Sequence, residues 1–156
     1  MNENAEKFMR EAIKRAKMAA AKGEVPVGAV IVRNGEIIAG AYNTRETGKN
    51  ALCHAEIKAI HKACRKLGGW RLPGCELYVT LEPCPMCTGA ILHARIPRIV
   101  CGAADPIAGA MGSVWALHRH PVENKHTAIE FGCLEEECRK ILQEFFRNRR
   151  DGRANK

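Results

Sequence analysis

The stretch TLEPCPMC, residues 80–87, places two cysteines two residues apart, with a proline before each of them. A residue before proline favours extended backbone, and proline fits the first turn of a helix. Residues 75–81 are rich in strand-forming side chains, and residues 84–95 are predicted to be a helix. We therefore expect this stretch to join a strand to a helix, with Cys84 and Cys87 at the helix N-terminus.

Further elements alternate along the chain on both sides of this junction. The apolar spacing predicts helices over 4–22, 54–67 and 134–150, and strands over 27–33, 36–42, 98–103 and 126–131. Asn34-Gly35 suits a type I′ hairpin turn, and Gly23 and Gly68 are placed to end helices. Helices that alternate with strands predict an α/β fold in which helices cover both faces of one sheet.

Length and composition favour a single domain over residues 1–156. There is no internal repeat or linker, and no apolar run is long enough to span a bilayer. The charged first residues do not resemble a secretory signal, so we expect a cytoplasmic protein with no membrane association. In that compartment the eight cysteines would be reduced thiols rather than disulfides.

The net charge of +8 is concentrated at the two ends of the chain. Residues 1–22 carry a net +3 and residues 139–156 a net +5, whereas the residues between them balance. The basic C-terminal helix and tail, residues 134–156, could serve solubility alone, or they could bind a polyanion such as a nucleic acid. Arg149 and Arg150 are the candidates for contacts with an RNA backbone.

A histidine at the start of another predicted helix could complete a metal site with the two cysteines. His54 precedes Cys84 by thirty residues, and imidazole and thiolate are the ligands that zinc prefers. A structural zinc site takes four protein ligands, whereas a catalytic site leaves one position open. The chain has no second CxxC pair and no HxxxH pair, and Cys53 is adjacent to His54, which disfavours it as a fourth ligand.

We therefore expect a catalytic zinc site formed by His54, Cys84 and Cys87, with one open position. Glu56 follows His54 by two residues and is placed to act as a general base rather than as a ligand. A structural zinc site, a redox pair and a chance CxxC remain the alternatives.

At this point the chain resembles a known family. HAE at 54–56 together with TLEPCPMC is similar to the signature of the zinc-dependent nucleoside deaminases. Four further segments resemble, in the same order, the bacterial tRNA adenosine deaminases: GEVPVGAVIV (23–32), HARIPRIVCGA (93–103), GSVWALHRHP (112–121) and FFRNRR (145–150). The resemblance implies a cytidine-deaminase-like three-layer α/β/α sandwich with a five-stranded mixed sheet, a homodimer, and one zinc ion per subunit.

The activity that the resemblance implies is hydrolytic deamination of the wobble adenosine of a tRNA anticodon to inosine. A zinc-bound hydroxide would attack the purine while Glu56 carries the protons. Asn43 matches an asparagine that hydrogen-bonds the base in the family, although a turn residue is the alternative. Asp105 matches a loop position near the RNA backbone, and the alternative is that Asp105-Pro106 opens a turn. Glu24 could line the pocket or face water, and Asn124 matches a family asparagine, here followed by Lys125.

Two other functions are compatible with the same motifs. One is a deaminase of a small free base or nucleotide, of the guanine or cytosine type. The other is a non-catalytic RNA-binding module with a structural zinc ion. The charge at the chain ends favours an RNA substrate over a free base, and a purely structural site has no use for Glu56.

Overall fold

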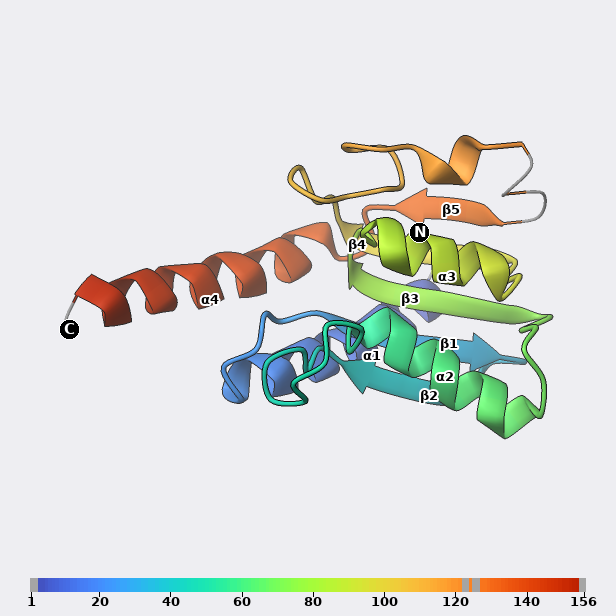
Figure 1. The fold of residues 1–156 in the computed structure, drawn as a ribbon, viewed down its shortest axis with the longest axis horizontal. Helices are drawn as coiled ribbons and strands as arrows, with labels where there is room; N and C mark the ends of the chain where they lie inside the picture. The colour runs from blue at the N-terminus through green and yellow to red at the C-terminus, as the bar shows by residue number, and fades with distance from the viewer. Residues whose placement is uncertain (1–2, 122–123, 125–126, 155–156) are drawn as a thin grey trace.

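One five-stranded sheet organises the chain, and two helices lie on each of its faces (Figure 1). The computed structural model describes residues 3–121, 124 and 127–154. In chain order the elements are α1 (Glu3–Ala21), β1 (Gly28–Arg33), β2 (Glu36–Tyr42), α2 (Ala55–Leu67), β3 (Cys75–Leu81), α3 (Pro85–His93), β4 (Arg98–Ala103), the 3-10 helix η1 (Leu117–Arg119), β5 (Ala128–Phe131) and α4 (Glu135–Ala154).

The sheet is mixed, with the strand order β2-β1-β3-β4-β5. β1 runs antiparallel to both β2 and β3, whereas β4 runs parallel to β3 and to β5. Asn34 and Gly35 connect β1 to β2 with φ angles of 53° and 77°, the positive values that a type I′ turn requires. The predicted hairpin and the mixed sheet are confirmed.

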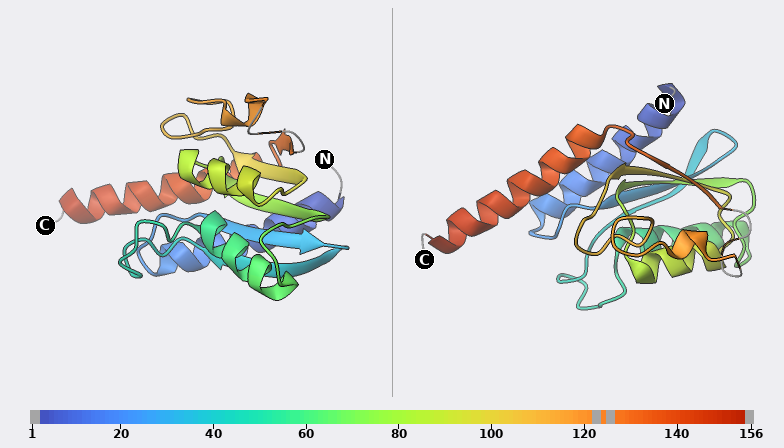
Figure 2. Two further views of the ribbon diagram at one scale, coloured as in Figure 1. Left: turned by 45° about the vertical axis from the view of Figure 1, so that its right-hand side comes forward. Right: turned by 90° about the horizontal axis from the view of Figure 1, so that it is seen from above.

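The strands bury alternate residues against opposite layers of helices (Figure 2). Val30 and Val32 pack with Phe8 of α1 in one core. Ala29 and Ile31 pack in the other core, which includes the buried alanines of α2 and Ile91 of α3. Because successive side chains of a strand point to opposite faces, one strand supplies both cores. The expected three-layer α/β/α sandwich is confirmed.

Several boundaries differ from the sequence prediction. The helix predicted over 84–95 ends at His93, and Arg95 then adopts a left-handed φ of 60° before Pro97. The C-terminal helix continues to Ala154 rather than stopping at residue 150. The last strand is described from Ala128, and residues 125 and 126, where its predicted start falls, lie outside the described residues. No sequence pattern predicted η1.

The eight cysteines are all free thiols in this fold. None of the helices within residues 3–121 and 127–154 combines the length and the apolar character needed to cross a membrane.

Candidate metal centre and substrate pocket

Two helix N-termini converge at one end of the central strands. His54 is the N-cap of α2, with φ −74° and ψ 153°, and Cys84 is the N-cap of α3, with φ −72° and ψ 174°. Pro85 restricts Cys84 to this extended conformation and begins α3, which puts Cys87 in its first turn. Neither N-cap side chain makes a capping hydrogen bond, so both are available to the site between the helices.

The three side chains meet with the spacing of a tetrahedral zinc site. Nδ1 of His54 lies 3.7 Å from Sγ of Cys84 and 3.5 Å from Sγ of Cys87. Zinc bonds of about 2.3 Å to sulfur and about 2.0–2.1 Å to nitrogen, at tetrahedral angles, separate nitrogen from sulfur by about 3.6 Å. Among the described residues, this is the one group of three metal-ligating side chains, and it includes neither Cys53 nor Glu56. The group therefore fits zinc with one position left open.

Hydrogen bonds within this group shift the acidities of its members. Cys87 donates to Cys84, and this bond, with further help from His54, lowers the pKa of the Cys84 thiol to about 4. The same contact with Cys84 raises the pKa of His54, while Cys87 has its pKa raised by the bond to Cys84 and by burial. One thiolate is thus favoured before a metal binds, and ligation by Cys87 would release a proton.

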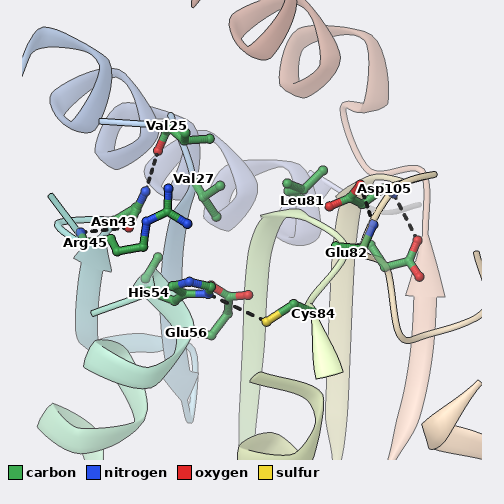
Figure 3. A pocket seen from close by; sticks show the side chains of 12 residues that line it. Val25, Val27, Asn43, Arg45, His54, Glu56, Leu81, Glu82, Cys84 and Asp105 are labelled. Atoms are coloured by element: carbon green, nitrogen blue, oxygen red, sulfur yellow. Dashed lines mark hydrogen bonds between the residues drawn. The ribbon is translucent and has the colours of Figure 1, made fainter. Parts of the chain in front are cut away.

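Glu56 lies behind this group on the first turn of α2 and points into the pocket (Figure 3). Its side chain is 4% exposed, and burial, reinforced by charge on Cys84, raises its pKa to about 7. A carboxyl group with a pKa near neutrality can both accept and return a proton at neutral pH.

The pocket in front of Glu56 has a volume of about 200 Å³. One wall comes from the turn after α1 and the loop after β2, the opposite wall from the end of β3 and the loop after β4, and the floor from the N-termini of α2 and α3 (Figure 3). The lining residues are Val25, Val27, Asn43, Arg45, His54, Ala55, Glu56, Leu81, Glu82, Cys84, Asp105 and Ala108.

Glu82 fixes the wall that follows β4. Its buried carboxylate accepts hydrogen bonds from the backbone N–H groups of Asp105, Met111 and Ser113, and from the Ser113 hydroxyl. Gly109 passes so close that an added Cβ would lie 2.4 Å from the carboxyl carbon. Burial opposes ionisation of Glu82, but these donors prevail and hold its pKa below the ordinary value. Glu82, two positions before Cys84, thereby anchors the irregular backbone of this wall.

Glu24 plays the corresponding part on the other wall. It is buried, and it accepts hydrogen bonds from the N–H groups of Glu46 and Thr47 and from the Thr47 hydroxyl. These donors outweigh its burial and lower its pKa. Glu24 thus neither faces water nor lines the pocket. It anchors the loop that carries Arg45, so this placement favours a positioning role for Glu24.

Asn43 and Asp105 line the pocket and also shape their own loops. The Asn43 amide donates to the carbonyl of Val25 at 3.2 Å and accepts from the N–H of Arg45 at 3.1 Å. The Asp105 carboxylate accepts from the N–H groups of Ile107 and Ala108. These contacts show that both residues stabilise turns, while hydrogen bonding of Asn43 to a base and the proximity of Asp105 to RNA stay predictions.

Three of the predicted substrate residues lie elsewhere. Asn124 donates to the carbonyls of His118 and Thr127, and it does not line the pocket. Arg149 and Arg150 are exposed near the end of α4, away from the pocket. Their contacts with a substrate stay predictions.

The charged pocket residues that sequence reasoning missed are Arg45 and Glu82. Glu82 lies inside the TLEPCPMC motif, so its position beside the cysteines could have identified it as a site residue. Arg45 carried no pattern of its own beyond standing two residues after Asn43.

Known proteins share this arrangement. The family model described as the cytidine and deoxycytidylate deaminase zinc-binding region matches residues 2–103, which include all three candidate ligands and Glu56. The chain belongs to this deaminase family.

Individual relatives are similar over most of their length. The chain is 52% identical to the tRNA-specific adenosine deaminase of Bacillus subtilis (strain 168) over 145 residues, covering 93% of this chain and 90% of the relative. A solved structure from studies of A-to-I editing by tRNA:A34 deaminases at the wobble position of transfer RNA superposes with a TM-score of 0.84 and 43% identity, covering 87% of this chain and 99% of that one. A guanine deaminase from Bacillus subtilis gives a TM-score of 0.62 and 42% identity, with coverages of 67% and 66%.

Proposed function

We propose that this protein is a zinc-dependent tRNA adenosine deaminase that converts the wobble adenosine of an anticodon to inosine. The observation that carries the proposal is a three-ligand group that opens onto a pocket lined by a buried glutamate. The similarity to tRNA-specific adenosine deaminases over nearly the whole chain supports this substrate.

In this proposal His54, Cys84 and Cys87 hold the zinc ion. When bound there, zinc supplies Lewis acidity that brings the pKa of water close to neutrality. Glu56 accepts a proton from the attacking water and gives it to the ring nitrogen beside the reacting carbon, so that the water oxygen can bond to that carbon. Glu56 then carries the second proton to the amino group, the carbon–nitrogen bond breaks, and ammonia leaves with inosine as the product.

The pocket suits a single base that is flipped out of its stack. Its hydrophobic side chains, Val25, Val27 and Leu81, offer surfaces for a ring, and we propose that Asn43 hydrogen-bonds the base edge. A base must leave its stack to enter such a site, and the unpaired bases of an anticodon loop can do so at lower cost than a paired base. Glu24 and Glu82 would keep the two walls apart at the width of the base.

We further propose that the enzyme acts as a homodimer in the cytoplasm. Exposed apolar side chains gather on the segment after β4, where Val114 is 45% exposed, Trp115 47% and Leu117 37%. A second copy could cover such a surface. Eight free thiols suit the reducing cytoplasm, where tRNA is also found.

Deamination of a small free base is the alternative that one observation favours. A guanine deaminase shares the fold and 42% identity over two thirds of this chain. The greater coverage and the higher TM-score of the tRNA:A34 deaminase structure favour the RNA substrate.

Incubation of the purified protein with total tRNA, followed by nucleoside analysis for inosine, tests the proposal. We expect inosine in tRNA and no ammonia from adenine, guanine or cytosine. Ammonia from a free base without inosine in tRNA would establish the alternative instead.

A further inference from the structure

A hollow follows the outer edge of the sheet beside the pocket. β2 is an edge strand, and α1 and α2 lie on opposite faces of the sheet next to it (Figures 1 and 2). The hollow has a volume of about 460 Å³, with Gly40, Ala41 and Tyr42 of β2 as its floor. We call this hollow and its bordering side chains the edge groove.

The edge groove gathers positive charge from both helix layers. Its cations come from α1 and the residue after it and from α2: Lys14, Arg15, Lys22, Lys58 and Lys62. Among the described residues that line the hollow, Glu11 supplies the one carboxylate. Three of these five cations, Lys14, Arg15 and Lys22, belong to residues 1–22, which carry a net charge of +3.

Contacts with β2 hold three of the ammonium groups in place. Lys62 donates to the carbonyl of Gly40 at 2.9 Å, and Lys58 donates to the carbonyl of Tyr42 at 3.1 Å. Lys22 donates to the Tyr42 hydroxyl at 2.6 Å, and the ammonium groups of Lys22 and Lys58 lie 5.2 and 5.1 Å from the Tyr42 ring centroid. Lysines on an edge strand also discourage pairing with other strands. An ammonium group has three donors, however, so a bond to the strand leaves capacity for another acceptor.

The pKa of the Tyr42 hydroxyl indicates a positive electrostatic potential in the groove. The hydrogen bond from Lys22, with the charges of Lys58 and Lys62, lowers the pKa of this phenol. A negative group is therefore stabilised at this position. Gly40 adds to the effect because the Arg15 guanidinium approaches it closely: a Cβ there would be 2.1 Å from Nε of Arg15. Only a glycine lets the guanidinium lie this close to the strand.

Consecutive residues of the chain line the groove and the substrate pocket. Asn43, the residue after Tyr42, lines the pocket, and Lys58 follows the candidate ligand His54 by one helical turn. Lys58 also donates to the Thr44 hydroxyl at 3.0 Å, at the start of the loop that carries Arg45. A backbone phosphate next to a base in the pocket would thus lie near the cations.

We propose that the edge groove binds phosphates of the RNA strand whose base enters the pocket. This inference rests on the proposed function and names a second contact surface for its substrate. RNA is favoured because the groove combines cations from both sides of the sheet with a position next to a pocket for a base.

The test is the double variant Lys22→Gln/Lys62→Gln, measured with a fluorescent anticodon stem-loop RNA between about 50 and 200 mM salt. Both side chains are exposed and neither lines the pocket. We expect the dissociation constant to rise roughly three- to thirtyfold. The slope of log affinity against log salt should become shallower by about 1.4 to 1.8, because two phosphates are no longer neutralised. The deamination rate at saturating RNA should stay at the wild-type value.

The matched control is Arg65→Gln/Lys66→Gln, which removes the same charge from the last turn of α2. Equal reductions of affinity in both variants, or no reduction in the groove variant, would overturn the proposal. A change in oligomer mass with unchanged RNA affinity would make the groove a contact between copies of the chain, and would also overturn it. If the wild type bound the RNA through the groove but formed no inosine in any tRNA, the proposed function would fail while RNA binding by the groove would stand.

Discussion

At the scale of single residues, three buried glutamates show how neighbours decide the role of one side-chain type. Glu24, Glu56 and Glu82 are 1%, 4% and 2% exposed, so none of the three faces bulk solvent. The backbone and hydroxyl donors around Glu24 and Glu82 lower the pKa of each, whereas burial raises the pKa of Glu56. The first two are suited to remain charged and anchor loops, and the third is suited to exchange protons.

Replacing Glu56 with glutamine should abolish most of the deamination while leaving the metal in place. The amide keeps the shape of the side chain but cannot carry the proton, so we expect the rate to fall roughly a hundred- to ten-thousandfold. Zinc content by mass spectrometry should match the wild type, because Glu56 is outside the ligand group. Glu36→Gln, an exposed change in the hairpin, is the control. Activity within a few-fold of wild type would refute the assigned role.

The purified protein should contain about one zinc ion per chain, held by three protein ligands. Alanine at His54, Cys84 or Cys87 should remove most of the zinc, whereas Cys53→Ala should retain it because Cys53 is outside the ligand group. X-ray absorption gives the independent check, with two sulfur ligands and two light-atom ligands expected. A third sulfur in the spectrum would show that the site is closed by another cysteine.

The sequence predicted the ligand group because the motifs themselves fix its geometry. His54 and Cys84 each begin a helix, and the prolines around Cys84 restrict its backbone, so local chemistry was sufficient. The anchoring by Glu82 was not predictable in the same way. Its donors, the N–H groups of Asp105, Met111 and Ser113, belong to irregular backbone more than twenty residues away, and no periodicity reports such a path.

At the scale of elements, the loop after β4 is hydrogen-bonded to the β3–α3 junction that carries Cys84. The N–H of Ala110 donates to the carbonyl of Pro83 at 2.9 Å, and the N–H of Glu82 donates to the carbonyl of Ala103 at 2.8 Å. The β3–α3 junction and this loop therefore form one unit around the Glu82 carboxylate. Loosening the unit should affect the pocket wall before it affects the sheet.

Gly109→Ala tests the packing of this unit. The added Cβ would lie 2.4 Å from the Glu82 carboxyl carbon and 2.5 Å from the carbonyl oxygen of Asp105, so the loop must shift. We expect the free energy of unfolding to fall by about 1–3 kcal/mol and substrate binding to weaken. Gly89→Ala is the matched control, since nothing lies within 4 Å of its Cβ in α3, and it should gain about 0.5–1 kcal/mol. Urea unfolding of both variants measures these changes. An unchanged free energy of unfolding in Gly109→Ala would contradict the close packing of Gly109 against Glu82.

Glu82→Gln should destabilise the fold in a pH-dependent way. The folded pKa of Glu82 is held below its ordinary value of 4.5, so its carboxylate contributes stability above that pH, and the contribution is lost as the pH falls through the folded pKa. The variant should cost about 2–4 kcal/mol at neutral pH. The difference from wild type should shrink as the pH falls through the folded pKa, because wild-type Glu82 then becomes protonated too. Urea titrations from neutral pH down into this acidic range measure the difference, and a constant difference would rule out the charged hydrogen bonds as its cause.

The central strands were predicted well, whereas the C-terminal ends of α3 and α4 were not. β3 and β4 match the predicted ranges 75–81 and 98–103. The end of α3 at His93 depends on the left-handed backbone of Arg95, which an arginine adopts only in its tertiary setting. The same limit explains η1, whose residues Leu117 to Arg119 have no helical pattern of their own.

At the scale of the whole molecule, two cationic regions lie at different distances from the pocket. The edge groove adjoins it, whereas α4 extends beyond the sheet and ends far from β2 and the N-terminus of α2 (Figure 1). The guanidinium of Arg149 lies 5.6 Å from the ring centroid of Phe145, and both border a hollow shared with Lys17 of α1. An RNA longer than the anticodon loop could touch both regions at once.

Replacing Arg149 and Arg150 with glutamine tests the distal region. Both side chains are exposed at the end of α4, so the sheet and the zinc content should stay as in wild type. Affinity for the anticodon stem-loop should fall, and the salt slope should become shallower by roughly 0.7–0.9 for each phosphate that the variant no longer neutralises. Sedimentation must accompany the binding measurement, because a helix that extends from the domain could also pack between two subunits. Unchanged affinity and salt slope, together with unchanged sedimentation, would mean that the end of α4 is only a solvated helix, and RNA binding would then depend on the surfaces around the pocket.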